Sequence, residues 1–269
     1  MSGQVDHSVR RDERRVGSPR AVSWRVHSLV LIVACMVSIS PVAAQEQRAD
    51  HLRLAVGNHF TVSFEGPKEE DLAARALESL DQAYWRICGI LNTYPNTPVP
   101  VVLYTSQEFR DITRAPPWAA GAFDGAIRVP MRGALEKTEE LDRVMAHEFT
   151  HALIRTLATR GVPTWLNEGL AAALERDSTD WADEHLEKAG GFLPLARLGT
   201  SFGPFPADQA ALAYATSAVA ARRMLDAAGG VAVSNLLRDL GEGQPFDAAF
   251  LHRMQRPFAE FAASLGRVD

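Results

Sequence analysis

The chain has 269 residues, of which 46% are hydrophobic and 23% charged, which fits one or at most two globular domains with a substantial core. Its formal net charge is −5. Residues 1–44 contain six Arg and three acidic residues, so the remainder carries 22 basic and 30 acidic side chains, a net charge of −8. A mildly acidic body argues against nucleic acid as the main partner.

The N-terminus has the pattern of a secretory signal peptide. Residues 1–28 are polar and Arg-rich, an apolar run extends from Leu29 to about Ile39, and small residues follow up to Ala44. We expect cleavage after Ala44 and an exported protein, periplasmic or secreted. The alternatives are an uncleaved membrane anchor, although the run is shorter than the roughly 20 residues of a comfortable span, and lipidation at Cys35. Membrane contact is expected only through this segment.

Cysteine usage fits a protein without disulfide bonds. Cleavage would leave Cys88 as the one cysteine, which cannot form an intramolecular disulfide. Cys88 falls on the apolar side of a predicted helix, so we expect it to be a small buried hydrophobic residue.

The first half of the mature chain predicts a small sheet and one long helix. Residues 45–55 are polar and are expected to form a loose leader. Strands are predicted at residues 59–64, where hydrophobicity alternates, at 99–104, which is almost continuously apolar, and at 126–129. Pro130 closes the last of these and belongs at a sheet edge. Apolar residues at helical spacing predict an amphipathic helix over 69–91, and a short capped helix is expected at 105–109.

The second half predicts helices throughout. The first begins with Thr138 as its N-cap and runs to about Arg160, where Gly161 and Pro163 stop it. Others are expected at residues 165–176, 180–188, 207–225 and 231–240, with short ones near 246–252 and 258–265. Because strands come early and helices late, the predicted class is α+β. We expect one domain over 45–269, with a sheet lobe at about 55–135 and a helical lobe at about 138–269.

The central helix carries an H-E-x-x-H motif, His147-Glu148-Phe149-Thr150-His151. Residues i and i+4 lie one above the other on a helix, so both imidazoles leave from one face and can share a metal ion, usually zinc. Glu148 follows the first histidine, a position from which it can act as general base on a metal-bound water.

A catalytic zinc site uses three protein ligands and leaves one position for water. The third ligand should come from a helix packed near the first. Glu168, in Trp165-Leu166-Asn167-Glu168-Gly169, lies one tight turn and one helical turn after the motif helix, from where a carboxylate can return to the metal.

These paired motifs resemble the gluzincin zinc peptidases. H-E-F-T-H followed by W-L-N-E-G-L-A is most similar to the small bacterial peptidase MA-like proteins and more distantly to aminopeptidase N-type enzymes. The segments at 121–130 and 214–217 (Tyr-Ala-Thr-Ser) also resemble that family, so the resemblance covers most of the mature chain.

The resemblance implies a role for each matching residue. His147, His151 and Glu168 would ligate one catalytic Zn²⁺, Glu148 would move the proton from water to the leaving amine, and Tyr214 is the candidate donor to the oxyanion. The strand at 126–129 would pair with an extended peptide if it borders the cleft. Thermolysin-type members place an Asp four residues after the ligand Glu to orient a histidine. Here that position is Ala172, which leaves the partner of the histidine unassigned.

The sequence therefore predicts a zinc metallopeptidase, a hydrolase that cleaves a peptide or protein substrate with a metal-activated water. One alternative is a zinc-binding domain with weak or no hydrolysis that acts as a binding or scaffold module at the cell envelope. Glu148 argues against it, because a purely structural site has no role for that residue. A second alternative is a membrane-anchored assembly protein whose N-terminal segment is retained.

Overall fold

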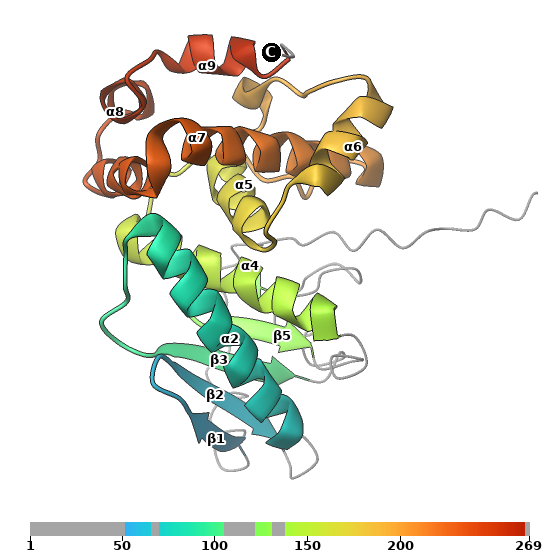
Figure 1. The fold of residues 1–269 in the computed structure, drawn as a ribbon, viewed down its shortest axis with the longest axis vertical. Coiled ribbons are helices and arrows are strands. Elements are labelled where there is room, and N and C mark those ends of the chain that lie inside the picture. The colour runs from blue at the N-terminus through green and yellow to red at the C-terminus, as the bar shows by residue number, and fades with distance from the viewer. Residues whose placement is uncertain (1–51, 66–69, 105–121, 131–137, 267–269) are drawn as a thin grey trace, which may run out of the picture.

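The computed structural model describes residues 52–65, 70–104, 122–130 and 138–266 (Figure 1). The predicted signal peptide at 1–44, most of the predicted leader and the short helix at 105–109 lie outside the described residues. Within these ranges, no helix is both long enough and apolar enough to cross a bilayer.

Strands in the N-terminal half form one mixed sheet in the order β1-β2-β3-β5-β4. β1 and β2 form an antiparallel pair, β3 is parallel to both β2 and β5, and β4 is antiparallel to β5. The bounds are β1 Leu52–Val56, β2 Phe60–Glu65, β3 Val99–Tyr104, β4 Ala122–Phe123 and β5 Ile127–Pro130. A sheet followed by a mainly helical region confirms the α+β class.

Two strand expectations were wrong. Residues 52–55 belong to β1 rather than to a loose leader. β1 pairs with β2 through backbone hydrogen bonds, but Leu54 and Val56 are 63% and 73% exposed. Because neither face of β1 is fully buried, its sequence shows little alternation of hydrophobic and polar residues. β5 is not an edge strand, because β3 and β4 pair with opposite sides of it at Ile127 and Arg128. Pro130 is the last residue of β5 and lies opposite Tyr104 of β3.

Two helices, α2 (Glu70–Leu91) and α4 (Thr138–Leu157), lie side by side on one face of the sheet (Figure 1). The apolar stripe of α2 is buried as predicted and includes Cys88, which is 0% exposed. Phe149 of α4 packs edge-on against Phe60 of β2, with ring centroids 5.3 Å apart. The motif helix is thus fixed to the sheet from its inner side. It ends at Leu157, earlier than the predicted Arg160.

The remaining helices form a second layer around a long one. They are α5 Thr164–Leu174, α6 Asp180–Ala189, α7 Ala207–Gly241, α8 Phe246–Met254 and α9 Phe258–Ser264. α7 is broken at Gly229, whose φ of 76° and ψ of 159° are not helical. This break separates the two helices that the sequence predicts at 207–225 and 231–240. Figure 1 shows α7 crossing above α5, between the sheet layer and α8 and α9.

α5 is held on three sides, which fixes the direction of Glu168. Its first turn donates the N–H groups of Thr164 and Trp165 to the carbonyl oxygens of Gly199 and Leu198. Trp165 is buried and stacks on Phe258. At Gly169 the backbone of α7 comes so close that a Cβ would lie 2.3 Å from the carbonyl oxygen of Ser217. A glycine directly after Glu168 is therefore a packing requirement of the α5–α7 contact.

Candidate metal centre

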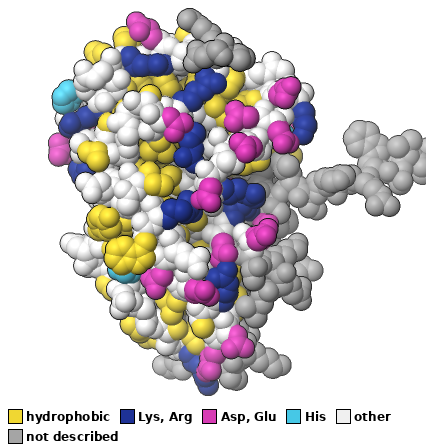
Figure 2. Space-filling view, viewed as in Figure 1, with side chains coloured by type: hydrophobic (Ala, Val, Ile, Leu, Met, Phe, Trp, Pro, Cys, Tyr) yellow, Lys and Arg dark blue, Asp and Glu magenta, His cyan; other side chains and the backbone are white. Residues whose placement is uncertain are grey.

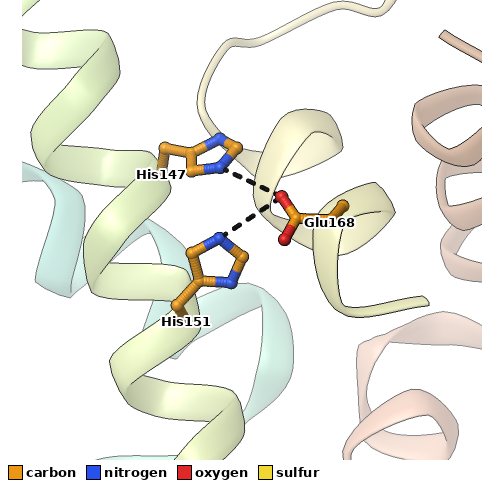
Figure 3. A group of neighbouring side chains, drawn as sticks. All are labelled: His147, His151 and Glu168. Atoms are coloured by element: carbon orange, nitrogen blue, oxygen red, sulfur yellow. Dashed lines mark ion pairs between the residues drawn. The ribbon is translucent and has the colours of Figure 1, made fainter. Parts of the chain in front are cut away.

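Three predicted ligands converge in the space between α4 and α5 (Figure 3). His147 and His151 leave the same face of α4, and their Nε2 atoms lie 3.7 Å and 3.6 Å from Oε2 of Glu168. All three residues are buried, at 1%, 4% and 3% exposed. Tetrahedral coordination at ordinary zinc–ligand lengths separates ligand atoms by about 3.3 Å, so this spacing matches three ligands around one ion.

The hydrogen bonding of these side chains also fits a cation. Nε2 of both histidines and Oε2 of Glu168 are buried and have no hydrogen-bond partner. Buried polar atoms are nearly always paired, and several unpaired ones at a single point need an explanation. A metal ion at their centre would satisfy all three. Two imidazoles and one carboxylate are also a usual donor set of catalytic zinc.

Glu148 lies beside this centre and is fully buried. Both of its carboxylate oxygens lack a hydrogen-bond partner, and its charge interacts with both histidines and with Glu168. Burial raises its pKa above the ordinary value, and this effect outweighs the opposing influence of the two imidazoles. A carboxylate with raised proton affinity beside a metal site has the properties of a proton acceptor.

A buried acid that the sequence analysis missed orients His147. Nδ1 of His147 lies 2.7 Å from Oε2 of Glu175, which follows the last residue of α5. Arg143, one turn before His147 on α4, forms an ion pair with the same carboxylate at 3.3 Å. Burial opposes ionisation of Glu175, but His147 and Arg143 outweigh it and hold its pKa below the ordinary value. An anionic partner at Nδ1 leaves Nε2 free for the metal.

His151 has a different partner. Its Nδ1 lies 3.2 Å from Oδ1 of Asn167, the residue before Glu168 in the second motif. Hydrogen-bonded to this amide oxygen, Nδ1 carries the proton and Nε2 again faces the centre. Asn167 and Glu168 therefore act on the same histidine from adjacent positions of α5.

Helical spacing could have identified Glu175. It lies seven residues after Glu168, which is about two turns and returns to the same side of α5. The thermolysin-type position, Ala172, is one turn after Glu168 and carries no polar side chain. In this protein the partner of His147 is Glu175, about one helical turn after Ala172.

A cavity of about 350 Å³ opens beside the ligands. His151, Asn167 and Glu168 form one part of its wall, and Phe123 of the edge strand β4 lies on another. His151 and Glu168 therefore border a hollow large enough for a peptide side chain.

Tyr214, the predicted oxyanion donor, has a different environment. It is 7% exposed on α7, and its ring packs edge-on against Phe202 at 5.2 Å. It is not among the described residues that line the cavity. Its proposed role stays a prediction.

No protein-family model matches the chain, and no curated protein matches it either. Among solved structures, the chain is similar to the crystal structure of Legionella pneumophila aminopeptidase A in complex with aspartic acid. The TM-score is 0.55 at 15% sequence identity, over 80% of this chain and 28% of that chain. The chain thus has the fold of part of an aminopeptidase, and it spans less than a third of that protein's length.

Proposed function

We propose that this protein is a zinc-dependent peptidase of gluzincin type, with His147, His151 and Glu168 as the metal ligands and Glu148 as general base. The observation that carries the proposal is the convergence between α4 and α5 of three buried ligand atoms that have no hydrogen-bond partner, with the buried carboxylate of Glu148 beside them. The likeness to an aminopeptidase supports the same class of reaction.

Zinc bound at this centre would supply Lewis acidity, lowering the pKa of a coordinated water and polarising a substrate carbonyl. Glu148 would accept one proton from the attacking water as the water oxygen forms its bond to the carbonyl carbon of the substrate. It then delivers that proton to the amine nitrogen as the C–N bond breaks. Glu175 and Asn167 hold the imidazoles in one tautomer throughout.

The substrate would be a peptide or protein lying along the cavity. The sequence suggested residues 126–129 as the strand that pairs with it, but β4 is the edge strand on this side of the sheet. Because Phe123 of β4 and His151 line the same cavity, we assign the pairing to β4. The predicted signal peptide supports a periplasmic or secreted location.

Metal analysis and cleavage of a peptide library by the purified protein test this proposal. We expect one zinc per chain and peptide hydrolysis. Glu148→Gln should keep the zinc and lose about 10²- to 10⁴-fold in kcat, the usual contribution of a general base. Glu139→Gln removes an exposed acid from the same helix and is the matched control.

Three results would contradict the proposal. Glu148→Gln turning over at the parental rate would remove that residue from the mechanism. Unchanged zinc stoichiometry in Glu168→Ala would exclude Glu168 as a ligand. Zinc binding with no cleavage of any library peptide would favour the binding or scaffold module instead.

A further inference from the structure

A second cavity, of about 560 Å³, lies next to the cavity beside the metal ligands. Phe123 of β4 lines both of them. On α4, His151 lines the metal-side cavity, whereas Ala152 and Thr156 line the second one. Successive residues of a helix are rotated by about 100°, so the two cavities lie on different sides of α4 at about the same level. Phe123 therefore marks the boundary between them.

One extended peptide can reach both cavities. α4 with its side chains is about 10–12 Å across, and the rotation from His151 to Ala152 and Thr156 is about 100–140°. The corresponding arc on the helix surface is about 9–15 Å, which three or four residues of extended chain span at about 3.4 Å each. A peptide whose cleaved bond lies at the metal centre can therefore place a residue three or four positions away in the second cavity.

The wall of the second cavity carries one charge among the residues that the structure describes. That charge belongs to Arg238 of α7, and most of the remaining wall is formed by residues 92–98, the connection between α2 and β3. Asn92 begins this connection in the left-handed conformation, with a φ of 46°, and Pro95 and Pro98 restrict its backbone further. The wall is thus largely formed before a ligand binds, which lowers the entropic cost of binding.

Arg238 is held in place by neutral groups. Its Nη1 donates to Oδ1 of Asn235 at 2.8 Å and to Oγ of Ser234 at 3.5 Å, and its Nη2 donates to Oγ1 of Thr93 at 3.0 Å. The Thr93 hydroxyl in turn donates to the carbonyl oxygen of Leu91. Within the described ranges Arg238 forms no ion pair, and three of the five N–H groups of a guanidinium are used, so two can donate to a ligand. A partly buried cation without an anionic partner favours the binding of an anion.

We propose that the second cavity is a substrate subsite in which Arg238 binds a carboxylate three or four residues from the cleaved bond. The inference rests on the proposed peptidase function and specifies its substrate class, peptides long enough to cross Phe123 that carry an acid at this distance. The carboxylate comes either from an Asp or Glu side chain or from the C-terminus of the peptide. A guanidinium binds both through the same charge-assisted hydrogen bonds.

Peptides that differ in one carboxylate test the subsite. Glu or Gln is placed at each of the five positions on either side of the cleaved bond, and the peptides are assayed with zinc-loaded protein. We expect kcat/KM to be about tenfold higher for Glu at one position three or four residues from the bond, in peptides with an amidated C-terminus. The same preference for a free over an amidated C-terminus at that distance would identify the terminus instead. Equal rates for all paired peptides would overturn the proposal.

Variants of the cavity wall assign the contact. Arg238→Gln should remove the preference, and Arg238→Lys should keep part of it. Thr156 is exposed, so Thr156→Asp places an anion on the same wall without removing a group that holds Arg238, and it should also remove the preference. Thr156→Asn and Arg197→Gln, the latter at an exposed arginine outside the cavity, are the controls and should leave the ratio between paired peptides unchanged. Thermal unfolding checks the fold of each variant. A preference that survives Thr156→Asp, or survives a folded Arg238→Gln protein, would overturn the proposal.

A binding measurement keeps the inference separate from the proposed function. The paired peptides are titrated calorimetrically into Glu148→Gln protein supplied with zinc, with and without Thr156→Asp. Tighter binding of the acidic peptide that is lost with Thr156→Asp supports the subsite even if hydrolysis is absent. Equal affinity for the acid and the amide overturns it, whether or not the protein cleaves peptides.

Discussion

Substituting Ala for Gly169 tests whether the α5–α7 contact controls the metal centre. The new Cβ would lie 2.3 Å from the carbonyl oxygen of Ser217 and 2.8 Å from its carbonyl carbon, where ordinary contacts begin at 3.4 Å. Both atoms belong to the backbone of a buried helix, so the helices must separate by about 1 Å, at a typical overpacking cost of about 1–3 kcal/mol. Glu168 precedes this residue and would move with it. Metal–ligand distances tolerate only about 0.2 Å, so we expect zinc affinity to fall at least tenfold.

Zinc affinity is measured by competition with a chromophoric chelator, and the free energy of unfolding by urea titration. Gly89→Ala is the control, because Gly89 is an exposed residue within α2 and a Cβ there would meet no atom within 4 Å. That change should leave zinc binding unaltered and raise stability by about 0.5–1 kcal/mol, as expected for Ala over Gly in a helix. Gly169→Ala protein with parental zinc affinity and stability would refute the reasoning.

Three other predictions concern the metal and the residues that hold it. Glu175→Gln should weaken zinc binding about 10- to 100-fold in a chelator competition, because it removes the anionic partner of His147. The control, Glu184→Gln on the exposed face of α6, should leave zinc binding unchanged. Equal zinc affinities of the two variants would show that Glu175 does not support His147. Burial alone would lower the pKa of His147, but in the metal-free protein the carboxylates of Glu168 and Glu175 outweigh it and raise the pKa from 6.5 to about 9. Zinc must displace the extra proton of His147, so the affinity for zinc should rise with pH between 6.5 and 9. By the same linkage, the stability that protonated His147 gives the metal-free protein is fully present below pH 6.5 and is lost as the pH rises through 9. An affinity that is flat with pH would contradict this. Chelation of zinc from protein held at free zinc 100-fold above Kd should lower Tm by roughly 5–10 °C in calorimetry without unfolding the protein at 25 °C; a Tm that chelator leaves unchanged would exclude a bound stabilising ion.

The elements that the sequence predicted well are those whose periodicity reflects burial on one side. The stripe of α2 and the break in α7 at Gly229 follow from side-chain spacing and glycine geometry, which are local properties. β1 and β4 were missed because they depend on partners. β1 exposes Leu54 and Val56, and β4 has two residues, too few to show a periodic pattern, that pair with β5.

The convergence of His147, His151 and Glu168 could be anticipated because two helices and one tight turn leave few ways to arrange them. Glu175 was missed because the expected position, Ala172, was taken from a different arrangement of the same site. Which side of α5 faces Arg143 depends on how α4 and α5 cross, and the contacts of α5 that influence this crossing, such as the one with α7 at Gly169, are tertiary. The distribution of surface charge does not point to the site either, because acidic and basic side chains are interspersed on the face shown in Figure 2.

The chain of contacts from Arg143 through Glu175 to His147 has a consequence for how a metal ion would bind at this centre. Both imidazole rings are already turned toward a common point by protein groups, within helices that a large apolar interior holds in place. Groups that orient the imidazoles in advance would reduce the ordering that metal binding requires, in contrast to a small zinc finger, which folds around its ion.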